Sequence, residues 1–110
     1  MRSLFANQPQ ILICGEAANG KEAVEQTVKL KPHIVILDVT MPLMNGLDAA
    51  REIKRLTPAP KVVILTMHES KHMRTDAQAA GADAYVPKME AAEKLLDMVK
   101  FLLEIRTETV

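Results

Sequence analysis

The sequence predicts an α/β fold in which helices cover a parallel sheet on both faces. Strand-like and helix-like segments alternate strictly along the chain, as in βαβ units with right-handed crossovers. The segments Ile34–Leu37 and Val62–Leu65 are uninterrupted apolar runs, as strands buried on both faces require. With further strands expected at residues 10–14 and 84–86, the predicted architecture is a doubly wound sheet of four strands.

Size and composition narrow the class of protein. A chain of 110 residues is expected to form one domain with one core. Fourteen basic and fourteen acidic residues balance, so no excess charge favours nucleic acid or an anionic membrane surface. We expect no membrane-spanning helix and no secretory signal. The single cysteine, Cys14, is interpreted as a buried thiol in a cytoplasmic protein.

Four helices are expected between and after the strands. Their predicted ranges are residues 20–30, 45–56, 70–80 and 90–105. The first three have suitable N-caps in Asn19, Asn45 and Ser70. The core face of the first helix is predicted to contain four residues: Ala23, Val24, Thr27 and Val28. The last helix has a wider apolar stripe than one packing face needs, because Met98, Phe101 and Ile105 extend it.

Three side chains of different chemistry stand where predicted strands end. Asp38 ends the strand that begins at Ile34, Thr66 ends the next strand, and Lys88 follows the last one. The carboxyl ends of parallel strands meet at one edge of a sheet, where ligands of open α/β folds bind. We therefore expect a carboxylate, a hydroxyl and an ammonium group to converge there.

These segments together resemble the receiver domain of bacterial two-component response regulators, most closely the LuxR-type subgroup. The resemblance covers residues 3–103 and rests on five segments: Gly15–Gly20, Leu37–Pro42, Met44–Leu47, Ile64–His68 and Gly81–Lys88. It implies a flavodoxin-like fold, a role in phosphorelay signalling, no enzymatic activity of its own, and a histidine kinase or small-molecule phosphodonor as partner.

The resemblance also implies roles for individual residues. Asp38 corresponds to the phosphoacceptor, Thr66 to the hydroxyl that follows the phosphoryl group, and Lys88 to the lysine that pairs with the site. Tyr85 corresponds to the aromatic residue that moves inward together with Thr66. This assignment is chemically consistent, because a carboxylate attacks phosphorus only when the charge on the phosphoryl oxygens is neutralised.

Receivers bind Mg²⁺ with an acidic pair that follows their first strand, and the sequence starts without a counterpart of that strand or pair. Asp38 and the backbone carbonyl of Thr40 remain as ligands, and Glu16 is hypothesised to replace the lost acid. We expect weak Mg²⁺ binding and impaired phosphorylation.

A truncated receiver without an output domain would expose a sheet edge, which predicts a homodimer or larger oligomer. The alternative function is association or partner binding without phosphorylation.

Three other interpretations have weaker support. Gly15–Lys21 fits the spacing of a phosphate-binding loop, but Glu22 stands where a magnesium-binding hydroxyl is needed. Asp38–Thr40 is similar to the start of aspartate-nucleophile phosphatases, which need a second acid where Thr40 stands. His68 and His72 have the spacing of metal ligands on a helix, without a third ligand. A solvated histidine pair is the simpler interpretation.

Overall fold

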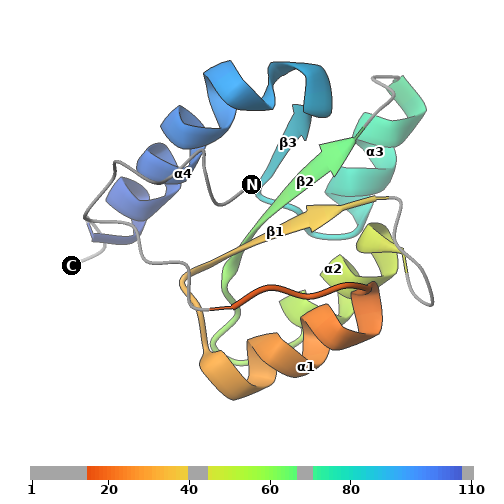
Figure 1. Ribbon diagram of the computed structural model, residues 1–110, viewed down its shortest axis with the longest axis vertical. Helices are drawn as coiled ribbons and strands as arrows, with labels where there is room; N and C mark the ends of the chain where they lie inside the picture. Colours follow the sequence, from red (N-terminus) through yellow and green to blue (C-terminus); the bar gives the residue numbers. More distant parts are fainter. Residues whose placement is uncertain (1–14, 40–44, 67–70, 108–110) are drawn as a thin grey trace.

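The computed structural model describes residues 15–39, 45–66 and 71–107 of the chain (Figure 1). In chain order its elements are α1 (Gly20–Leu30), β1 (Ile34–Asp38), α2 (Gly46–Lys54), β2 (Lys61–Thr66), α3 (Lys71–Ala79), β3 (Ala84–Pro87), the 3₁₀ helix η2 (Lys88–Glu90) and α4 (Ala91–Thr107). All three strands are parallel and lie in the order β1-β2-β3. The predicted α/β architecture is confirmed; the fourth predicted strand, at residues 10–14, lies outside the described residues.

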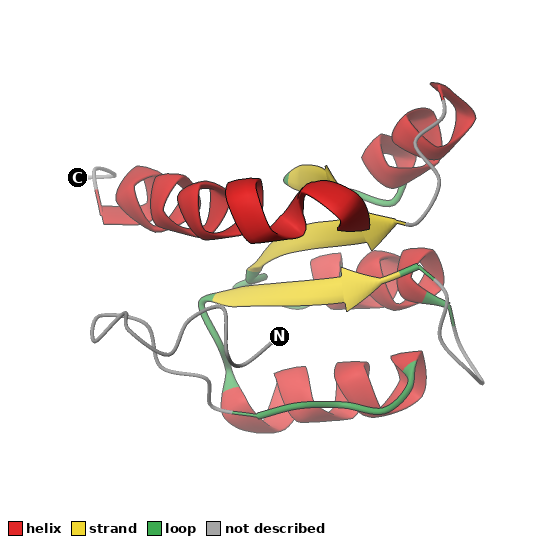
Figure 2. Cartoon of the chain, turned by 45° about the horizontal axis from the view of Figure 1, so that its top comes forward, coloured by secondary structure: helices red, strands yellow, loops and turns green. Residues whose placement is uncertain are grey.

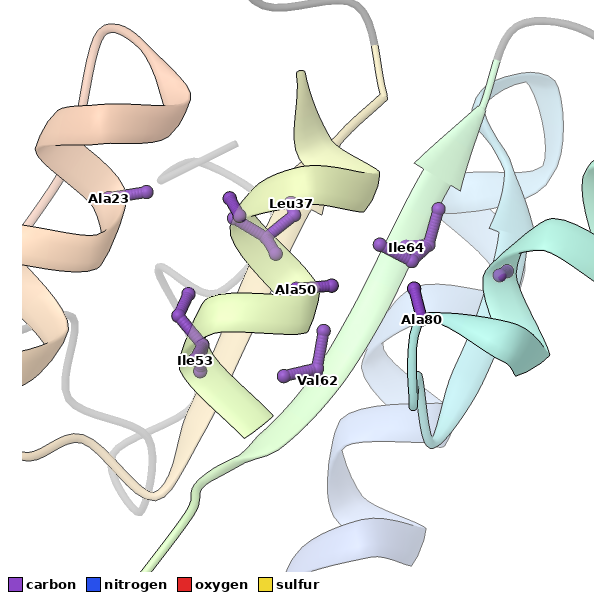
Figure 3. Packing of buried hydrophobic residues seen from close by; sticks show 9 residues of the cluster. Ala23, Leu37, Ala50, Ile53, Val62, Ile64 and Ala80 are labelled. Carbon is purple, nitrogen blue, oxygen red and sulfur yellow. The ribbon is translucent and has the colours of Figure 1, made fainter. Parts of the chain in front are cut away.

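Helices cover the two faces of the sheet unequally. On one face, α2 and α3 pack against the sheet and α1 packs mainly against α2, through a cluster of small and branched residues. Figure 3 labels seven members of this cluster: Ala23, Leu37, Ala50, Ile53, Val62, Ile64 and Ala80. On the other face, α4 is the one helix within the described residues that packs against the sheet, through a second cluster: Val63, Leu65, Val86, Leu95, Val99 and Leu102. Figure 2 shows α4 and the pair α1 and α2 on opposite sides of the strands. β2, the middle strand, is buried on both faces because its alternating side chains pack into the two clusters.

The helix ends follow the predicted capping chemistry. The side-chain oxygen of Asn19 accepts a hydrogen bond from the Glu22 N–H at 2.8 Å, and α1 has the predicted bounds. α2 ends at Lys54, two residues before the predicted end. The Arg55 N–H bonds to Glu52 at 3.2 Å, so the last turn tightens ahead of the prolines that follow. Gly81 has the predicted left-handed conformation, with φ of 89°.

The prediction that Val28 of α1 belongs to the core is wrong. Ala23 and Thr27 are buried, but Val28 is 53% exposed. The reason is that α1 packs mainly against α2 rather than over the sheet, so its contact face is narrower than the apolar pattern suggested. On α4, Phe101 belongs to the residues that widen the apolar stripe and is 56% exposed, whereas Met98 packs partly against the core. The side chain of Ile105 lies outside the described residues.

A polar network fixes the amino-terminal edge of the sheet, opposite the strand ends that carry Asp38 and Thr66. The Asp83 carboxylate accepts hydrogen bonds from the Val62 N–H at 2.8 Å and from the Lys54 ammonium at 2.9 Å. The same ammonium donates to the Pro60 carbonyl at 3.0 Å. This network ties α2 to the start of β2 and the loop before β3.

Along the part of the chain that the structure describes, no helix has the length and apolar character needed to cross a bilayer.

Candidate phosphoacceptor site

Asp38 and Lys88 form an ion pair at the carboxyl edge of the sheet. Asp38 is the last residue of β1, and Lys88 directly follows β3. Because β2 lies between these strands, the two backbones are separated by roughly two strand spacings, about 9–10 Å, which a lysine side chain spans. Their side chains are 28% and 35% exposed, so the pair is open to solvent on one side. A carboxylate is thereby held beside a cation within reach of a dissolved reactant.

Thr66 occupies the end of the middle strand. Asp38 is paired in register with Leu65, so Thr66 stands one residue further along β2. Its own partner across the sheet is Pro87, the residue before Lys88. The ion pair therefore crosses the end of the strand that Thr66 terminates. Thr66 is 2% exposed, unlike the two charged residues. The three residue types occupy the same edge of the sheet, as the sequence predicted.

Gly46 positions the strand end that carries Asp38, and the sequence interpretation did not single it out. The Gly46 N–H donates to the Val39 carbonyl at 3.1 Å, so α2 begins against the backbone that leaves β1. A methyl group on Gly46 would lie 2.3 Å from the Asp38 carbonyl oxygen. Asn45 caps this helix by accepting from the Asp48 N–H at 2.9 Å. Asn45 caps α2 as predicted, and Gly46 beside it brings the start of α2 close to the backbone at the end of β1.

Tyr85 lies at a groove between α3, β3 and α4. The groove has a volume of about 410 Å³, and Arg74, Glu90, Lys94 and Met98 line it together with Tyr85. The guanidinium carbon of Arg74 lies 5.8 Å from the centre of the Tyr85 ring. This distance is within the range of a cation–π contact. No sequence pattern had linked these two residues.

Of the residues considered for metal binding, those that the structure describes do not form a protein-built metal centre. Among the side chains that the structure describes, there is no group of three or more His, Cys, Asp or Glu suited to hold a metal ion. Glu16 lies in the exposed segment that leads into α1. Thr40 and His68 lie outside the described residues, and His72 is exposed on α3. Among these residues, the Asp38 carboxylate fits Mg²⁺ as one ligand.

The phosphate-binding-loop interpretation of residues 15–21 is weakened by the cap of α1. In such a loop the backbone N–H groups at the start of the helix bind phosphate oxygens. Here the N–H of Glu22 donates to the Asn19 side chain. Glu22 also places a carboxylate in the first turn, where it would repel a phosphate. The local structure is that of an ordinary capped helix.

Sequence comparison identifies the family. A model of the family described as "Response regulator receiver domain" matches residues 1–100. The chain belongs to this family. Curated relatives include a protein-glutamate methylesterase/protein-glutamine glutaminase from Methanosarcina mazei, which is 38% identical over 94% of this chain and 29% of the relative. Chemotaxis protein CheY from Thermotoga maritima is 43% identical over 69% of this chain and 63% of that protein. This receiver chain spans less than a third of the methylesterase relative.

Solved structures show the same receiver fold. A two-component response regulator of the LuxR family from Aurantimonas sp. SI85-9A1 is 31% identical, with a TM-score of 0.87 over 94% of this receiver and 74% of that chain. The response regulator domain of Thermotoga maritima CheB is 26% identical, with a TM-score of 0.82 over 94% of this chain and 88% of that one. The predicted flavodoxin-like receiver fold is therefore confirmed.

Proposed function

We propose that the chain is a phosphoaccepting module of two-component signalling, in which Asp38 receives a phosphoryl group from a histidine kinase or a small-molecule phosphodonor. The observation that carries this proposal is the ion pair between Asp38 and Lys88 across the end of β2. The partial exposure of the Asp38 carboxylate gives a donor access to it. The module has a regulatory role and no catalytic activity of its own. The likeness to a LuxR-family regulator supports the predicted subgroup.

The geometry suits an in-line transfer. A carboxylate oxygen of Asp38 attacks phosphorus, the bond from phosphorus to the donor breaks, and an acyl phosphate forms. Because protein groups contribute mainly position and charge to phosphoryl transfer, the ammonium of Lys88 is the principal described group that offsets the phosphoryl charge. The Thr66 hydroxyl then donates to a phosphoryl oxygen, which draws Thr66 and Tyr85 into a new packing arrangement.

Mg²⁺ in this proposal is bound weakly. Asp38, Glu16 and the backbone carbonyl of Thr40 are the proposed residues that would hold the ion, which would offset negative charge on the phosphoryl oxygens. Mg²⁺ is usually held by one or two carboxylates together with substrate phosphates, so these residues would hold it only weakly, in line with the impaired phosphorylation that the sequence predicts. Calorimetric titration of the Glu16→Gln variant tests the ligand set. An unchanged Mg²⁺ affinity would remove Glu16 from it.

Intact-mass spectrometry after incubation with acetyl phosphate and Mg²⁺ tests the function. We expect one phosphoryl adduct on the unmodified chain and none on Asp38→Asn. Asp48→Asn is the matched control, since Asp48 is an exposed aspartate in the first turn of α2 and should leave the adduct unchanged. An adduct that persists in Asp38→Asn would show that another residue is the acceptor.

A second function, association without phosphorylation, is favoured by apolar surface. Three consecutive apolar residues of β1 are only half-buried: Ile34, Val35 and Ile36. Phe101 and Val28 are more than half exposed. Apolar area of this kind is covered when chains associate. Light scattering at micromolar concentration is expected to show a dimer or larger assembly. If the chain is a monomer and Asp38 still gains its adduct, the association function is rejected and the phosphoaccepting function is retained.

A further inference from the structure

The contact between Arg74 and Tyr85 joins two elements that border the groove. Arg74 lies on α3 and Tyr85 on β3, and both line the cavity of about 410 Å³. The 5.8 Å separation places the guanidinium over the ring of Tyr85. Three other ionic groups line the groove, and each has a partner of opposite charge. Lys94 pairs with Glu90 at 2.9 Å, and Asp83 pairs with Lys54 at 2.9 Å. The contact of Arg74 with the Tyr85 ring thus joins α3 to β3 at the groove.

Tyr85 and Thr66 lie on the same side of the sheet as Arg74. Tyr85 is paired in register with Ile64, which packs in the cluster under α3. Side chains alternate along a strand, so Thr66, two residues after Ile64, points to the same face. The Tyr85 ring packs partly against that cluster, and Arg74 extends from the helix above it. Movement of the Tyr85 ring toward Thr66 therefore either breaks its contact with the Arg74 guanidinium or requires that the Arg74 side chain move with it.

We infer that Arg74 is a positioning residue that holds the Tyr85 ring at the groove and so sets how readily the ring moves toward Thr66. This regulation rests on the proposed function, because the movement matters only when Asp38 is phosphorylated. A cation–π contact at a partly exposed site shifts a two-state equilibrium by about two- to fivefold. Arg74 thus opposes the inward position in the unmodified chain, and phosphorylation must overcome that bias.

The amino-acid composition makes the ring easy to observe. The chain has one tyrosine and no tryptophan, so every tyrosine ring signal comes from Tyr85. Nuclear magnetic resonance of protein labelled in tyrosine rings and threonine methyl groups would measure the cross-peak between Tyr85 and Thr66, which reports the inward population. For Arg74→Gln we expect that population to rise about two- to fivefold without any phosphodonor. Arg74→Lys, which keeps the cation, should stay within about twofold of the original chain.

Matched controls separate this effect from general changes in charge. Arg51→Gln removes an exposed arginine of α2 that pairs with Asp48, and it should leave the Tyr85 signal unchanged. An unchanged cross-peak in Arg74→Gln would overturn the inference, as would equal values for Arg74→Gln and Arg74→Lys. The measurement needs no phosphorylation. If the cross-peak does not change in Arg74→Gln while Asp38 still gains its phosphoryl adduct, only the role of Arg74 in positioning Tyr85 is rejected. If the adduct is missing, the proposed function is rejected, and the contact between Arg74 and Tyr85 is unaffected.

Discussion

Replacing Lys88 with methionine is expected to slow formation of the Asp38 phosphoryl adduct by about 100- to 1,000-fold, the usual cost of removing one preorganised group that stabilises transition-state charge. Methionine keeps the unbranched chain of lysine and removes its charge. The ammonium lies against the Asp38 carboxylate, where negative charge accumulates on the phosphoryl oxygens during transfer. The rate of mass gain with acetyl phosphate at fixed Mg²⁺ concentration measures the loss.

The same substitution should have little effect on folding. Both side chains of the pair are about one-third exposed, and solvent-exposed ion pairs contribute roughly 0–1 kcal/mol to the free energy of unfolding. The expected rate loss corresponds to about 3–4 kcal/mol of activation free energy, so the two effects are separable. Lys29→Met, an exposed change in the last turn of α1, serves as the control and should keep the original rate. A Lys88→Met variant that gains mass as fast as this control would contradict a role for the cation.

The edge that carries Asp38 was predictable because it depends on local sequence and chain direction. An apolar run that ends in Asp38 determines where β1 stops. Parallel strands bring their carboxyl ends to one edge of the sheet, independently of the length or conformation of the loops between them. The cap of α1 was predictable for a similar reason, since Asn19 and the Glu22 N–H are three residues apart. Features determined within one turn or one strand can be predicted from sequence alone.

Features that depend on how two elements meet could not be predicted in this way. Val28 fits an apolar helix face, yet it is exposed because α1 packs mainly against α2 and little against the sheet. Arg74 and Tyr85 come together only because α3 packs beside β3, and neither residue type indicates the other. The close contact of Gly46 with β1 likewise depends on how two elements meet. The sequence shows a helix cap, whereas the distance to the Asp38 carbonyl arises from tertiary packing.

Gly46→Ala should both destabilise the fold and slow phosphorylation. Alanine favours a helix over glycine by up to about 1 kcal/mol, whereas overpacking costs about 1–3 kcal/mol. The added methyl group would meet the Asp38 carbonyl oxygen at 2.3 Å and the carbonyl carbon at 2.8 Å, both backbone atoms that cannot rotate away. The steric term therefore exceeds the helix propensity. Urea unfolding followed by circular dichroism should show a lower midpoint with an unchanged slope.

Gly81→Ala distinguishes loss of stability from displacement of the acceptor. Gly81 has φ of 89°, a conformation that costs an alanine roughly 1–2 kcal/mol, so this variant should also be destabilised. It precedes β3 at the opposite edge of the sheet, where its substitution leaves the Asp38 backbone in place. A misplacement of about 1 Å at a reacting group can slow a reaction about 100-fold. Below the unfolding transition, Gly46→Ala should therefore gain phosphate much more slowly than Gly81→Ala. Equal rates would mean that α2 yields to the methyl group without moving the carboxylate.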